Sequence, residues 1–169
     1  MHSSRSDSIV FRQLGRRPRL PWRVVKTCRF GFPQVIVSPS LLEDGDRFPN
    51  WAYLTCPHLV RKVSQIEASG GVSRWAARAL SDENLRAGLK RIDAEVREAR
   101  LSECRASGQD DDACEGVGLA GQRNIYGVKC LHIHVAYALA GLHDPIGNEI
   151  LEGLRFIGDE SCQEGEPCA

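Results

Sequence analysis

The feature of this sequence that most constrains its fold is a change of hydrophobic periodicity near Pro57. Before it, three short segments rich in β-branched and aromatic residues predict strands at 22–27, 34–37 and 51–55. After it, apolar residues recur at helical spacing, and Pro57 suits the first turn of a helix that Gly70 and Gly71 end. This order predicts an α+β fold, in which a small N-terminal sheet of about three strands packs against three or four helices.

Three more helices are expected after the glycine pair. A long one begins near Ser81 and Asp82, whose side chains can cap it, and fades near Cys104. Its single apolar stripe is formed by Leu85, Leu89, Ile92 and Val96. The alanine-rich stretch before Gly141 indicates a helix that begins close to Cys130, and a short helix over about 148–156 follows.

Length and charge set the expected organisation of the chain. We expect a disordered leader over 1–11, one domain over 12–156, and a disordered acidic tail over 157–169. The formal net charge is zero, so nothing draws the whole chain toward nucleic acid, and we expect no nucleic-acid partner. The first 30 residues hold eight basic side chains against one acid, and a solvated arm is the favoured interpretation. Its candidate polyanion-binding residues are Arg12, Arg16, Arg17 and Arg19.

The chain has no apolar stretch of signal-peptide or membrane-spanning length, which predicts a cytoplasmic protein without a membrane span. In that compartment its seven cysteines favour metal ligands, reactive thiols or plain burial over disulfides.

Two tryptophan-led strands, WRVVKTC and WAYLTC, each end in a cysteine, Cys28 and Cys56. The segment GVKCLHIH adds Cys130, His132 and His134. Thiolates and imidazoles are the usual zinc ligands, so Cys28, Cys56, Cys130 and His132 form a candidate Cys3His site. A structural zinc ion is expected, because a Cys3His set leaves no clear open position, and an iron–sulfur cluster is the alternative. Cys130 and His132 can share an ion only if regular helix starts after Cys130, and His134 is assigned to packing.

Two other classes of function stay open from the residues alone. The first is a metal-free thiol enzyme, in which Cys56 at a helix start is the nucleophile and His58 or His132 is the base. The second is an adaptor or polyanion-binding module that works through the N-terminal arginines. No substrate can be assigned, and whether the protein is an enzyme is left open.

Several motifs in order carry a resemblance to a known family. They are RQLGR-x-PR (12–19), LEDG…FP (42–49), YLTCP (53–57), GVKCLH (127–132) and LA…DPIG (139–147). Together they resemble the domain of unknown function 501 family, which is found chiefly in actinobacteria. The resemblance implies a small cytosolic protein without an assigned activity, with ligand-type residues at Cys28, Cys56, Cys130 and His132. It also implies, through gene context alone, a link to cell-division or polyphosphate proteins.

Overall fold

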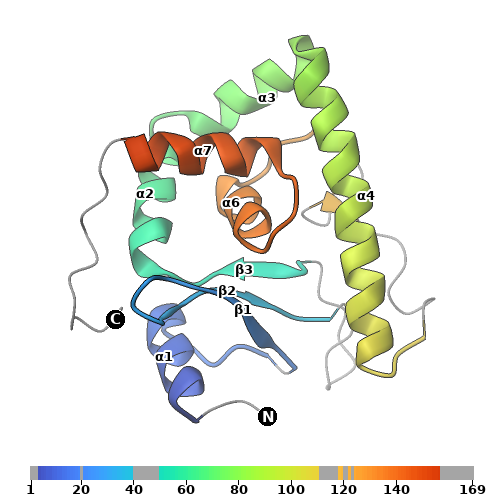
Figure 1. Cartoon of the computed structure of the whole chain (residues 1–169). Coiled ribbons are helices and arrows are strands. Elements are labelled where there is room, and N and C mark those ends of the chain that lie inside the picture. Colours follow the sequence, from blue (N-terminus) through green and yellow to red (C-terminus); the bar gives the residue numbers. More distant parts are fainter. Residues whose placement is uncertain are drawn as a thin grey trace.

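The structure is a computed structural model that describes residues 4–19, 21–39, 50–110, 118–119, 122 and 124–156. In this part of the chain six helices surround a three-stranded sheet (Figure 1). The elements are α1 (Ser4–Leu14), β1 (Arg23–Thr27), β2 (Pro33–Val37), β3 (Ala52–Leu54), α2 (Pro57–Ala68), α3 (Gly71–Ser81), α4 (Glu83–Ala106), α6 (Leu131–Leu139) and α7 (Pro145–Phe156). The predicted α+β class and its N-terminal sheet are confirmed.

The sheet is antiparallel in the order β1-β2-β3, and its central strand is covered on both faces. Val35 and Val37 belong to the main core, whereas Ile36 packs with Val10 and Trp22 in a second, smaller cluster. Because successive side chains of a strand alternate between faces, the two clusters lie on opposite faces of the sheet. Figure 1 accordingly shows α1 on one side of the sheet and α6 on the other.

Helix α1 stands where the sequence predicts a disordered leader. Ile9 and Val10 are buried, and α1 covers the sheet face that carries Ile36. At the end of the helix the Gln13 side-chain amide donates a hydrogen bond to the Pro33 carbonyl, at 2.9 Å. The sequence did not predict this helix because its apolar face is short and is flanked by polar residues. That face is buried only through its contact with the sheet. The predicted acidic tail over 157–169 lies outside the described residues.

The middle helices follow the sequence signals with one exception. Helix α2 begins at Pro57, as predicted, and α4 is capped by Asp82 Oδ1, which accepts from the Leu85 amide at 2.9 Å. The predicted apolar stripe of α4 is buried. The exception is α3, which the sequence analysis left unassigned, although Val72, Trp75, Ala76 and Ala79 recur along it at helical spacing and pack in or against the main core.

Helix α6 lies at the centre of the molecule, and Figure 1 shows it nearly end-on between the sheet and α7. Val135, Ala136 and Tyr137 are fully buried, as expected for a helix with neighbours on every side. Its crossing with α7 is very close, since a Cβ atom added at Gly147 would overlap the His134 carbonyl oxygen. Only glycine permits this approach.

Two further findings concern membrane-spanning helices and cysteine pairing. In the described ranges, none of the helices combines the length and the apolar character needed to cross a bilayer. Cys104, buried in the last turn of α4, is disulfide-bonded, whereas Cys28, Cys56 and Cys130 are not. The bond at Cys104 departs from the expectation of unpaired thiols, because that expectation rested on the inferred compartment and not on geometry.

Candidate metal centre

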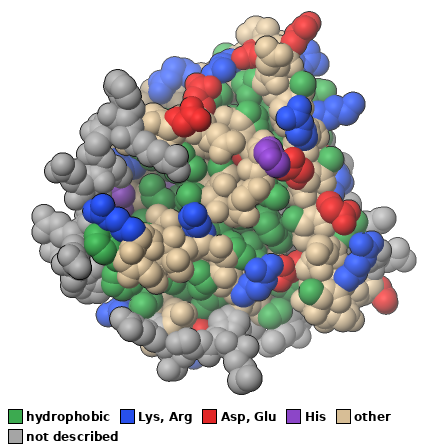
Figure 2. Space-filling view, viewed as in Figure 1, with side chains coloured by type: hydrophobic (Ala, Val, Ile, Leu, Met, Phe, Trp, Pro, Cys, Tyr) green, Lys and Arg blue, Asp and Glu red, His purple; other side chains and the backbone are tan. Residues whose placement is uncertain are grey.

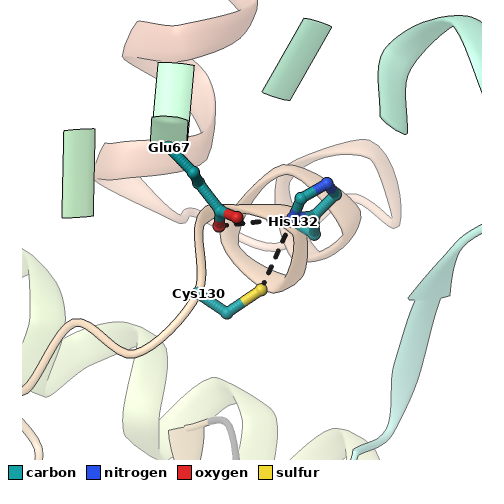
Figure 3. Close-up of side chains that lie close together, drawn as sticks. All are labelled: Glu67, Cys130 and His132. Atoms are coloured by element: carbon teal, nitrogen blue, oxygen red, sulfur yellow. Dashed lines mark hydrogen bonds and ion pairs between the residues drawn. The ribbon is translucent and has the colours of Figure 1, made fainter. Parts of the chain in front are cut away.

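Cys130, His132 and Glu67 come together where the last turn of α2 meets the first turn of α6 (Figure 3). Cys130 is the N-cap of α6, with extended backbone angles of φ −158° and ψ 129°. The extended N-cap turns its side chain toward the second helical residue, His132. The prediction of a helix that begins close to Cys130 is therefore confirmed, and its start just after the cysteine explains how two residues so close in sequence converge.

Two of the three separations between the ligand atoms match those of a tetrahedral zinc site. Cys130 Sγ lies 3.6 Å from His132 Nδ1, and His132 Nδ1 lies 3.2 Å from Glu67 Oε1. All three ligand atoms lie within 4.8 Å of one another. With Zn–S near 2.3 Å and Zn–N and Zn–O near 2.0–2.1 Å, tetrahedral angles give S···N of about 3.5 Å and N···O of about 3.3 Å. The two measured separations agree with these values to about 0.1 Å.

The remaining polar atoms of the ligands have partners that orient them. His132 Nε2 lies 3.2 Å from the Val60 carbonyl oxygen and 3.1 Å from Ser64 Oγ. Since a carbonyl only accepts, Nε2 carries the proton, and in the neutral ring Nδ1 keeps its lone pair facing Cys130 and Glu67. Glu67 Oε1 also accepts a hydrogen bond from the Leu131 amide at 2.6 Å. Metal-binding histidines are commonly oriented in this way, by donation to a carbonyl.

Without a metal, His132 holds a proton tightly. The hydrogen bond with Cys130 is the largest cause that raises the pKa of His132 to about 9, and the charge of Glu67 and the Val60 carbonyl act in the same direction. Partial burial opposes the shift. At neutral pH the metal-free imidazole therefore carries a proton on Nδ1, and a metal ion that binds there has to displace this proton.

A family model described as "protein of unknown function (DUF501)" matches residues 24–152. The chain belongs to the DUF501 family. No curated protein and no solved structure matches it. Glu67, Cys130 and His132 all lie inside the DUF501 match, whereas the arginines at 12–19 precede it.

The structure brings together two of the four predicted metal ligands of this DUF501 protein, Cys130 and His132. Cys28 lies in the hairpin between β1 and β2, where its amide donates to the Phe32 carbonyl at 2.9 Å. Cys56 is the N-cap of α2 and is 2 % exposed within the main core. Neither belongs to the ligand group found among the described residues. A four-ligand site that includes them stays a prediction.

Glu67 is the member of the group that the sequence analysis missed. It lies in the last turn of α2, 64 residues before its hydrogen-bond partner Leu131. Val60, Ser64 and Glu67 share one face of α2, because they are four and three residues apart. That spacing is visible in the sequence, but the sequence does not reveal that this face meets His132.

The group borders a cavity of about 470 Å³, which Cys130 and His132 help to line. Three protein ligands with a neighbouring cavity are typical of zinc sites that keep one position for water or substrate. A metal ion held by these three residues would be able to polarise a bound molecule or activate a water molecule, which an ion in a closed four-ligand site would not.

His134 is separate from this group. It is fully buried, and its Nδ1 lies 2.8 Å from Oδ2 of the equally buried Asp144. Asp144 Oδ1 accepts from the Gly147 amide at 2.8 Å, which ties the start of α7 to α6. The geometry is that of a structural contact between the two helices and agrees with the assignment of His134 to packing.

The predicted polyanion-binding arginines Arg12, Arg16, Arg17 and Arg19 are all exposed. Arg12 lies in the last turn of α1, and the other three follow it. On the face in Figure 2, basic and acidic side chains are interspersed, and no broad basic patch is visible among the coloured residues. Binding of a polyanion by these arginines stays a prediction.

Proposed function

We propose that the protein is a metal-binding protein in which Cys130 Sγ, His132 Nδ1 and a Glu67 carboxylate oxygen hold one divalent transition-metal ion, with zinc preferred. The agreement between the Sγ–Nδ1 and Nδ1–Oε1 separations and tetrahedral zinc geometry carries the proposal. The hydrogen bond from His132 Nε2 to Val60 supports it, because it directs the lone pair of Nδ1 toward the other two ligands.

The donor set favours zinc over the alternative of an iron–sulfur cluster. Iron–sulfur clusters are held mainly by thiolates, and this group offers one thiolate, one imidazole and one carboxylate. One sulfur, one nitrogen and one oxygen suit a borderline cation such as zinc. Cys130 and His132 also line the neighbouring cavity, so the ion is proposed to meet a small molecule there.

The test is the metal content of untagged full-length protein after equilibration with zinc and removal of unbound ions. We expect about one equivalent of zinc. Cys130→Ser, His132→Gln and Glu67→Gln should each weaken zinc binding by at least about tenfold. Cys28→Ser is the matched control, because it removes a partly buried cysteine outside the ligand group and should retain full binding.

Two outcomes would contradict this assignment. One is less than a tenth of an equivalent of any transition metal in the wild type after anaerobic purification. The other is loss of zinc in Cys28→Ser equal to that in Cys130→Ser, which would return the site to the Cys3His set.

A second candidate function is thiol chemistry at Cys130. Its sulfur lies 3.6 Å from an imidazole nitrogen, at a helix N-terminus, and lines the cavity. Those features activate cysteine nucleophiles. They favour Cys130 over the nucleophile suggested by the sequence, Cys56, which is 2 % exposed. Fast, stoichiometric alkylation of Cys130 by iodoacetamide that zinc fails to slow would favour this function over the metal site.

A further inference from the structure

The cavity beside the ligand group combines a mostly apolar lining with one arginine side chain. Its volume is about 470 Å³, within the range of about 300–1,000 Å³ typical of small-molecule sites. The end of α1, strand β3, the first turns of α2 and the start of α6 form its walls, so three regions of the chain that are far apart in sequence line it. Most of the lining side chains are apolar, among them Leu14, Leu54, Val60 and Ile133.

The charges at this cavity are of one sign. Arg61 lines it and is exposed, and none of the described residues that line it is an Asp or a Glu. Arg61 has no ion-pair partner among the described residues. Pro57 and Cys130, which also line the cavity, mark the N-termini of α2 and α6, where helix dipoles place partial positive charge. An anion is therefore the charged group that this cavity accommodates.

Two buried polar atoms at the cavity have no hydrogen-bond partner in the part of the chain that the structure describes. They are Thr55 Oγ1, on a residue that is 1 % exposed, and Gln13 Oε1. The Gln13 Nε2 amide already donates to Pro33, which leaves Oε1 as an acceptor. Buried polar atoms without partners are costly, and a bound molecule with a hydrogen-bond donor would satisfy them.

We propose that this cavity binds a small amphipathic anion. The ligand has an apolar body that fills the space between Leu14, Leu54 and Ile133, an anionic group that pairs with Arg61, and a hydrogen-bond donor for Gln13 Oε1 or Thr55 Oγ1. The ligand lies against Cys130 and His132, but its binding uses neither Glu67 nor a metal. It therefore goes beyond the proposed metal site and is tested separately from it.

The probe is 1-anilinonaphthalene-8-sulfonate, which combines an apolar ring system, one anionic group and one N–H donor. N-phenyl-1-naphthylamine is the matched probe, because it has the same rings and N–H group but no charge. Both are titrated by fluorescence into chelator-treated full-length protein, so that failure of the metal proposal cannot affect the result. Arg61→Gln is compared with Arg91→Gln, an exposed α4 position outside the cavity lining.

We expect one saturable site for the sulfonate. Arg61→Gln should weaken its binding at least about fivefold, because a charge-assisted contact is lost. Binding of the uncharged probe should not change, and Arg91→Gln should change neither probe. Thr55→Val should raise the melting temperature of the free protein and reduce the further rise caused by the sulfonate, since it removes the unpaired hydroxyl that the ligand satisfies. Absence of a saturable site, or equal sulfonate binding by the Arg61 and Arg91 variants, would overturn the proposal.

Discussion

At the scale of single residues, His132 is the group on which the candidate site depends. Its two ring nitrogens face different partners: Nε2 meets the Val60 carbonyl, and Nδ1 meets Cys130 and Glu67. The first contact fixes the ring, and the second leaves one nitrogen for a proton or a metal ion. The same geometry therefore governs the stability of the metal-free protein and its affinity for metal.

The raised pKa of His132 predicts a pH dependence of stability in the metal-free protein. The pKa of the group is 6.5 when unperturbed and about 9 in the fold, so the imidazolium stabilises the fold fully below pH 6.5. This contribution should be lost as the pH rises from 6.5 through about 9. Urea unfolding of wild type and His132→Gln should show a difference on the order of 2 kcal/mol at pH 6 that shrinks by pH 9.5. A difference that stays constant over this range would contradict the assignment.

The buried pair of His134 and Asp144 predicts a second residue-scale effect. Asp144→Asn keeps the shape of the side chain but disrupts a fully buried pair that also holds the Gly147 amide. We expect a loss of about 3 kcal/mol in the free energy of unfolding. Glu95→Gln is the control, because its partner His143 is 77 % exposed and such pairs contribute at most about 1 kcal/mol. Equal effects of the two substitutions would refute a structural role for the buried pair.

At the scale of elements, the close crossing of α6 and α7 positions the core helix that begins at Cys130. Two glycines of α7 distinguish close packing from helix propensity. A Cβ at Gly147 would overlap the His134 carbonyl, whereas a Cβ at Gly153 meets nothing within 4 Å. The two helices are therefore in backbone contact at Gly147, whereas Gly153 has space for a side chain.

Substituting alanine at these two glycines should change stability with opposite signs. Gly147→Ala should destabilise the protein by about 2 kcal/mol or more, because the crossing has to open. Gly153→Ala should be neutral or stabilise it by up to about 1 kcal/mol, since alanine has the higher helix propensity. Thermal or urea unfolding of both variants provides the comparison. A crossing that tolerates Gly147→Ala without loss would mean that α6 and α7 are not in backbone contact.

The elements also show what the sequence could and could not predict. Strands, the start of α2 at Pro57 and the cap of α4 at Asp82 follow from local preferences, and these predictions are confirmed. Helix α1 could not be predicted, because Val10 gains a partner only when the second face of the sheet exists. Glu67 was missed for the same reason: its role is created by the contact between α2 and α6.

At the scale of the whole molecule, the candidate site lies where the sheet, α2 and α6 meet beside one cavity. Local signals placed Cys130 and His132 at a helix start and marked them as ligands. The identity of their neighbour depended on tertiary packing, which brings Glu67 next to them. The family match covers every residue of the proposed centre, which belongs to the DUF501 part of the chain.

The central claim is the identity of the donor atoms, and X-ray absorption at the zinc edge of the zinc-loaded full-length protein tests it most directly. Sulfur and nitrogen or oxygen ligands differ in distance, near 2.3 Å and about 2.0–2.1 Å respectively, so they can be counted separately. We predict one sulfur ligand, with nitrogen and oxygen in the remaining positions. Three sulfur ligands, or a sulfur signal that persists in Cys130→Ser, would contradict this account.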